Sequence, residues 1–158
     1  MVVDPSEGLR DLVDAGLDPD EVLFRIVQPG FVNFAVEPPE AQSNGFQDQR
    51  LDVANGFGLN GPCASVAIKS IWVAEGADVD QLLAGFPANS GIAQFTVGAV
   101  RDLLTLAGEP CPQSVMPDPR DGSPWHAVMW DEKRAGHTKA VKRARAQVAE
   151  WFREPTAH

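Results

Sequence analysis

The sequence lacks the features that would place the protein in a membrane or send it through one. No apolar run approaches the roughly 20 residues that a membrane-spanning helix needs, so we expect no membrane association. The first residues, Met1–Glu7, carry neither the basic start nor the apolar core of a secretory signal peptide. We therefore expect a cytoplasmic protein.

Cysteine is also scarce. Cys63 and Cys111 are the two cysteines of the chain, and neither belongs to a Cys-x-x-Cys pair. This usage argues against a disulfide framework and against a cysteine-rich zinc site. We expect no metal and no organic cofactor.

Basic residues are also few, since the chain has 13 lysine and arginine residues and 22 aspartate and glutamate residues. A nucleic-acid duplex would repel the resulting net charge of −9, so nucleic acid is not expected as a partner. An acidic surface instead suits association with a basic protein.

What remains is a composition close to the globular average, with 44% hydrophobic and 22% charged residues. A chain of 158 residues then predicts one domain, 1–158, that is large enough to bury a core. The apolar periodicity predicts an α+β fold, with a small antiparallel or mixed sheet, packed helices and an amphipathic C-terminal helix. The expected strands are 22–27, 31–36, 92–95 and 125–130, and the expected helices are 78–83, 96–108 and 138–152.

The connections between these elements are predicted from their turn residues. Pro29-Gly30 would join the first two strands as a hairpin, although Pro-Gly favours turns that splay strands. The segments 37–61 and 109–123 are rich in turn residues and are interpreted as loops. In 138–152 the basic residues should occupy the exposed face of the helix.

The segment from Asn60 to Trp72 is the one that points to chemistry. Pro62 suits the first turn of a helix, and a set of apolar residues falls on one helical face: Ala64, Ile68, Ile71 and Trp72. This pattern favours a helix. Val66 and Ile68 also lie between the polar residues Ser65 and Lys69, so a strand from Cys63 to about Ile68 is the open alternative.

A helix that starts at Cys63 would activate its thiol. The amides of a helix N-terminus stabilise a thiolate, and a neighbouring imidazolium does so further. His126 heads the strand 125–130 and would supply that imidazole, while Asp131 would orient it. The catalytic prediction is therefore Cys63, His126 and Asp131.

This order of cysteine, histidine and aspartate resembles the papain-like cysteine hydrolases. In particular, Gly61-Pro62-Cys63 before an apolar helix looks like the start of the bacteriocin-processing peptidases and related amidases. Those enzymes carry a glutamine shortly before the cysteine for the oxyanion hole, and the matching position here is Phe57. Gln47, Gln49 or Asn60 would have to take its place.

A second resemblance covers more of the chain. Ser43-Asn44-Gly45-Phe46, Ser65-Val66 and Pro124-Trp125-His126-Ala127 are similar to the pattern of an uncharacterised family of small bacterial proteins with an arginine in the first strand. This resemblance implies no activity. It adds a set of candidate binding residues: Arg25, Ser43, Phe46, Asn60, Ser65 and Trp125.

Three hypotheses follow, and residues 63–68 distinguish them. A thiol-dependent hydrolase or acyltransferase, acting on a small molecule or peptide, requires Cys63 to be accessible and close to His126. A non-catalytic interaction module of the antitoxin or immunity type, with a basic protein partner, predicts that Cys63 is buried. A nucleotide- or NAD-handling enzyme would use Arg25, Ser65 and His126 on the sheet and needs 63–68 free of helix.

The third hypothesis rests on a likeness to ADP-ribosyltransferase-like folds, which use arginine and serine on strands. The acidic Glu-x-Glu signature of those folds does not occur in this chain.

Overall fold

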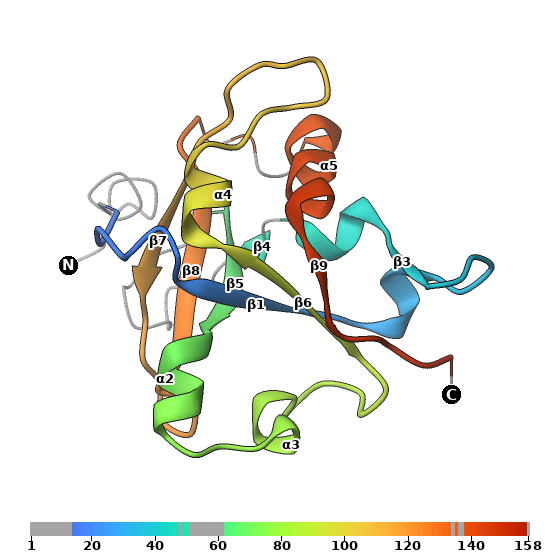
Figure 1. Cartoon of the computed structure of the whole chain (residues 1–158), viewed down its shortest axis with the longest axis vertical. Coiled ribbons are helices and arrows are strands. Elements are labelled where there is room, and N and C mark those ends of the chain that lie inside the picture. The colour runs from blue at the N-terminus through green and yellow to red at the C-terminus, as the bar shows by residue number, and fades with distance from the viewer. Residues whose placement is uncertain (1–13, 48, 51–61, 134, 136–137, 158) are drawn as a thin grey trace.

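The structure is a computed structural model that describes residues 14–47, 49–50, 62–133, 135 and 138–157 (Figure 1). It confirms the predicted α+β class, because an antiparallel sheet carries a few short helices. The strands are β1 (Val22–Val27), β2 (Val32–Asn33), β3 (Glu40–Ala41), β4 (Gln49–Arg50), β5 (Pro62–Ile68), β6 (Gly91–Thr96), β7 (Gln113–Pro117), β8 (His126–Asp131) and β9 (Glu150–Arg153). The helices are α2 (Lys69–Ala74), α3 (Val79–Leu82), α4 (Val97–Arg101) and α5 (Lys139–Val148), with 3-10 turns η1 (Pro29–Phe31) and η2 (Ser43–Phe46). Within the described residues, none of these helices has the length and apolarity that crossing a membrane requires.

Strand β1 lies at the centre of the sheet. The strand order is β7-β8-β5-β1-β6-β9, and β4 pairs with the start of β5. Every strand pair that the structure describes is antiparallel. A central strand is covered on both faces, and the near-continuous apolar run of β1, VLFRIV, suits that place.

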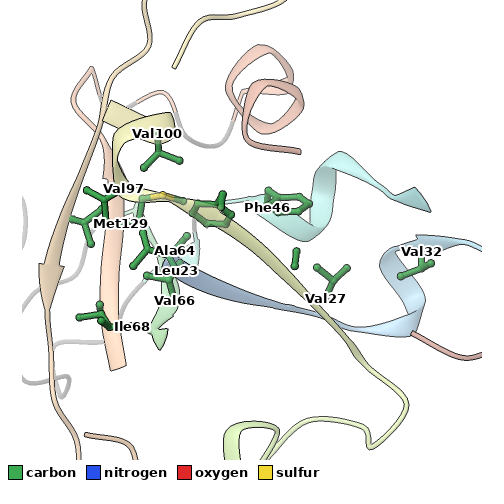
Figure 2. Packing of buried hydrophobic residues seen from close by; sticks show 14 residues of the cluster. Leu23, Val27, Val32, Phe46, Ala64, Val66, Ile68, Val97, Val100 and Met129 are labelled. Atoms are coloured by element: carbon green, nitrogen blue, oxygen red, sulfur yellow. The ribbon is translucent and has the colours of Figure 1, made fainter. Parts of the chain in front are cut away.

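The two faces of the sheet bury separate clusters, because side chains alternate along a strand. On the core face, Leu23 and Val27 pack with Val66 beneath α4, α5 and η2 (Figure 2). On the opposite face, Phe24 packs with Ala67 against α2 and α3. We call this second face the cleft face. Each fully buried leucine or phenylalanine contributes about 1.5–3 kcal/mol to the hydrophobic driving force for folding.

The hairpin expected from 22–27 and 31–36 is wrong. Strand β1 pairs with β5 and β6, whereas the second segment contributes only the short β2, which pairs with β3. Pro29 and Gly30 open η1 instead, with Phe31 N–H donating to Gln28 O at 2.9 Å. A Pro-Gly turn of this kind splays its flanking segments and directs the chain away from β1.

Three further segments differ from the sequence prediction. The helix of 96–108 ends at Arg101, although it starts where expected, capped by Thr96, whose Oγ accepts from Ala99 N–H at 3.1 Å. The expected loop 109–123 contains β7. The C-terminal helix ends at Val148, and β9 follows it along the edge of β6. The apolar residues near this end fit a helical pattern, and pairing with β6 overrides it in favour of the strand.

Arg145 departs from the amphipathic pattern of α5. Its side chain is fully buried, although the basic residues of this helix were expected to face solvent. Its Nη1 donates to Phe46 O and its Nε to Gln113 Oε1, each at 2.8 Å. Gln113 Nε2 in turn donates to Asp131 Oδ1 at 2.8 Å. This amide therefore links the buried guanidinium to a buried carboxylate and offsets part of the desolvation of both.

We expect Gly91→Ala to destabilise the protein. An added Cβ would lie 2.6 Å from Cζ3 of Trp151 and 2.9 Å from Cδ of Pro155. Overpacking of this kind costs about 1–3 kcal/mol. The free energy of unfolding measured in urea should fall by that amount. Gly30→Ala is the control, because a Cβ there meets nothing within 4 Å, and an equal loss in both variants would contradict the packing argument.

Candidate functional site

Three polar side chains, one on β5, one on β8 and one directly after β7, meet on the cleft face. His126 begins β8 and pairs with Ala67 of β5, so Ser65, two residues away on β5, is its diagonal neighbour on the same face. Asp118 directly follows β7, and its N–H donates to His126 O at 2.8 Å, which sets the two residues opposite each other. The register of β7, β8 and β5 thus collects residues that are far apart in the sequence.

A hydrogen-bond chain joins the three side chains. Ser65 Oγ lies 3.2 Å from His126 Nε2. His126 Nδ1 lies 3.1 Å from Asp118 Oδ2 and 3.0 Å from Asp118 O. Both partners of Nδ1 are acceptors, so Nδ1 carries the proton and the neutral ring offers its Nε2 lone pair to the Ser65 hydroxyl.

The charge state of His126 follows from its surroundings. Burial lowers its pKa from the ordinary 6.5, and the positive charge of Arg120 lowers it further. The hydrogen bonds to Asp118 and the negative charge of its carboxylate raise the pKa of His126, but by less than burial and Arg120 lower it. Arg120 also pairs with Asp118, its Nη2 lying 2.9 Å from Oδ2. The imidazole is therefore neutral at neutral pH, as a proton acceptor must be.

Arg25 fills a gap in the sheet beside this chain of residues. In the described ladder, β1 pairs with β5 through Leu23 and Phe24. Next to these pairs, Arg25 Nη1 donates to Ser65 O at 2.8 Å and Nε donates to Gly45 O at 2.9 Å. The guanidinium thereby takes the place of ladder hydrogen bonds and ties β1 to both β5 and η2.

Two adjoining cavities open where β1 and β5 separate. The first has a volume of about 210 Å³, and its lining includes Phe24, Arg25, Ser65, Arg120, Trp125 and His126. The second has a volume of about 300 Å³, and its lining includes Arg25, Phe31, Asn44, Gly45 and Ser65. Because Arg25, Ile26, Ser65 and Phe86 line both cavities, we treat them as one cleft with two lobes.

The helix expected to start at Cys63 is wrong for residues 62–68, which form β5, and α2 begins only at Lys69. Cys63 is fully buried within the strand and has no helix N-terminus to activate it. It lies four residues before Ala67, the partner of His126, which is about 13 Å along an extended strand. The thiol-hydrolase hypothesis required Cys63 to be accessible and close to His126, and the structure meets neither requirement. A buried Cys63 is what the interaction-module hypothesis predicts.

Asp131 does not orient His126. The two residues are five positions apart on β8, and an odd spacing places their side chains on opposite faces of the sheet. Besides the amide of Gln113, the Asp131 carboxylate accepts the N–H groups of Lys133 and Ala135, at 3.1 and 2.9 Å. Its role is to organise the turn after β8. Asp118 takes the role of orienting His126, which the sequence analysis assigned to Asp131.

The predicted binding residues divide into two groups. Those that line the cleft with His126 are Arg25, Ser65 and Trp125. Phe46 is a core residue, and Ser43 begins η2 and is half-buried. Asn60 lies outside the described residues.

Asp118 and Arg120 are the site residues that sequence reasoning missed. The prolines of 109–123 indicated a loop and concealed β7. The available signal was the run Asp118-Pro119-Arg120-Asp121-Gly122, which has the composition of a turn between two apolar segments. Recognised as a hairpin, it would have placed Asp118 beside the head of β8.

The described residues contain no group of three or more histidine, cysteine, aspartate or glutamate side chains that is suited to holding a metal ion. No protein-family model, curated protein or solved structure matches the chain. Function must therefore be inferred from the cleft itself.

We expect both thiols to react slowly in the folded protein. Cys63 is 0% exposed and Cys111 3% exposed, and burial together with the charge of Asp131 raises the pKa of the Cys111 thiol. Alkylation by iodoacetamide at pH 8, followed by intact-mass spectrometry, should be at least about tenfold slower in the native protein than in urea. Fast native alkylation of Cys63 in the Cys111→Ser variant would contradict this expectation.

We expect His126 to titrate below pH 6.5 in the folded protein. Because its pKa is lowered on folding, the unfolded chain binds more protons than the folded protein as the pH falls below 6.5. This group therefore stabilises the fold above that pH, and its contribution is lost as the pH falls toward the folded-state pKa. NMR titration of the ring protons, assigned with His126→Asn, measures the midpoint. A midpoint above 6.5 would show that Asp118 outweighs burial and Arg120.

Proposed function

We propose that this protein is a nucleotide-handling enzyme whose cleft binds a dinucleotide such as NAD as substrate. The observation that supports the proposal is the convergence of Arg25, Ser65 and His126 on one cleft. The nucleotide hypothesis selected these three residues on sequence grounds and required 63–68 to be free of helix. Strand β5 covers that range.

The charge of the cleft suits phosphate groups. Arg25 lies where the two lobes meet, and Arg120 lines the first lobe with 40% of its side chain exposed. A guanidinium binds phosphate oxygens with two parallel N–H donors and is the preferred side chain for this purpose. In a chain with a net charge of −9, these two cations favour the approach of an anion to this part of the surface.

The shape and lining of the cleft suit a ligand with two rings and a charged centre. Phe86 lines both lobes, Trp125 lines the first and Phe31 lines the second. Aromatic side chains stack on nucleobases, and each such contact contributes about 1–3 kcal/mol. A dinucleotide has a ring at each end and a pyrophosphate between them, which would lie at Arg25. A mononucleotide would fill one lobe.

The Ser65–His126–Asp118 chain supplies an acid–base group to this cleft. The ADP-ribosyltransferase-like folds that suggested the hypothesis carry a Glu-x-Glu signature, which this chain lacks. His126, held by Asp118, is the group in the cleft that would take or give a proton in its place.

The glycine run before β5 does not support the proposal. Gly56-Phe57-Gly58-Leu59-Asn60-Gly61 has the spacing Gly-x-Gly-x-x-Gly, but the whole run lies outside the described residues. In the dinucleotide fingerprint such a run follows a strand and opens a helix. Here a strand, β5, follows it.

We expect NAD to bind and Arg120→Ala to weaken that binding about tenfold, the loss typical of one charged hydrogen-bonding contact. Isothermal titration calorimetry with NAD, ADP-ribose, AMP and nicotinamide measures the affinities. The two-lobed cleft predicts that NAD binds more tightly than AMP or nicotinamide.

The matched control is Arg143→Ala, which removes the same charge from an exposed position on α5. It should leave the affinity for NAD unchanged. Failure of all four compounds to bind at millimolar concentration, or an equal effect of the two arginine variants, would contradict the proposal.

A further inference from the structure

We propose that Ser65 is a covalent nucleophile, with His126 as its general base and Asp118 as the residue that positions His126. The electrophile would be the acyl carbon of an ester or a comparable phosphorus centre. This activity goes beyond nucleotide binding and does not depend on it.

The geometry supplies each part of an activated serine. A serine hydroxyl becomes a nucleophile when a neighbouring base removes its proton, and Ser65 Oγ lies 3.2 Å from His126 Nε2. The base must present a lone pair on that nitrogen. Asp118 ensures this by accepting the Nδ1 proton at two oxygens, 3.0 and 3.1 Å away. Ser65 on β5, His126 on β8 and Asp118 directly after β7 thus perform the three roles of a catalytic triad.

The surroundings favour negative charge on the reacting oxygen and give a reactant access to it. Arg25 Nη1 donates to the carbonyl oxygen of Ser65 at 2.8 Å, so a permanent positive charge lies next to the peptide unit of the nucleophile. Ser65 and His126 both line the first lobe of the cleft, whose apolar lining includes Phe24 and Trp125. Such a lining reduces the competition from water for the histidine lone pair.

The reaction balances without a co-reactant other than water. The Ser65 oxygen bonds to the acyl carbon of an ester, and the hydroxyl proton moves to His126 Nε2. The bond from the acyl carbon to the leaving oxygen then breaks, and the leaving alcohol takes the proton from His126. Water next attacks the acyl-serine with His126 as base, which releases a carboxylic acid and restores the hydroxyl.

A fluorophosphonate probe tests this inference on the full chain. The serine oxygen displaces fluoride from phosphorus, so one oxygen–phosphorus bond forms, one phosphorus–fluorine bond breaks, and the hydroxyl proton passes through His126 to solvent. We expect one adduct per chain, and peptide mapping of the wild-type protein should place it on Ser65. The rate should rise with pH along a single titration whose midpoint lies below 6.5, because burial and Arg120 lower the pKa of His126.

Variants distinguish a Ser65 hydroxyl that His126 activates from one that is merely accessible to the probe. Ser65→Ala should abolish the adduct, and His126→Asn, which retains a donor for Asp118 but removes the base, should slow labelling at least tenfold. Asp118→Asn should slow it and change its pH profile, because an amide can donate to Nδ1 and so favour the wrong tautomer. Ser70→Ala, at an exposed position on α2, is the control and should label at the wild-type rate.

Each result decides the question. No adduct on wild-type Ser65, an adduct on other serines instead, or wild-type labelling of a folded His126→Asn protein would overturn the proposal. Circular dichroism confirms that each variant is folded. Because the probe contains no nucleotide, labelling can succeed where NAD fails to bind, and the reverse result is equally informative.

Discussion

The guanidinium of Arg25 is the interaction on which the arrangement of the sheet and the cleft depends. Two central strands of an antiparallel sheet normally remain paired along their length, but β1 and β5 separate after Phe24, and Arg25 occupies the gap. Charge-assisted hydrogen bonds to two carbonyl oxygens are roughly twice as strong as neutral ones. They make the separation stable, and the separation creates the cleft. One side chain therefore acts as a structural clamp and as the charge at the centre of the site.

Because side chains alternate along each strand, one face of the sheet packs the core while the other face carries the polar residues of the cleft. The core face carries the larger apolar cluster, while Ser65 and His126 project from the cleft face of the same strands. Polar groups are costly to bury without partners, and here His126 and Asp118 partner each other. Asp118 lies between His126 and Arg120, so its negative charge orients one and holds the other close. The site is an ordered network and not a set of independent side chains.

Local sequence signals predicted the fold class and the best-defined elements, namely the strand 22–27, the starts of the helices expected at 78 and 96, and the strand that starts near His126. They failed where pairing with a distant segment decides the structure. The range 63–68 fits a helix or a strand, and pairing with β8 and β1 selects the strand. Asp118 was missed for the same reason, because the pairing of β7 with β8, and not a local sequence pattern, sets it beside His126. Arg25, Ser65 and His126 were found through resemblance to known patterns, which compares residue types along the chain and needs no knowledge of strand pairing.

The buried Arg145 has a consequence for the order of folding. Its guanidinium bonds to Gln113 and to the carbonyl of Phe46, which are 32 and 99 residues away in the chain. Until β7 and η2 are both in place, water solvates this charge better than the protein does, and docking of α5 would bury it without compensation. The C-terminal helix should therefore join the sheet late, after its two distant partners have come together.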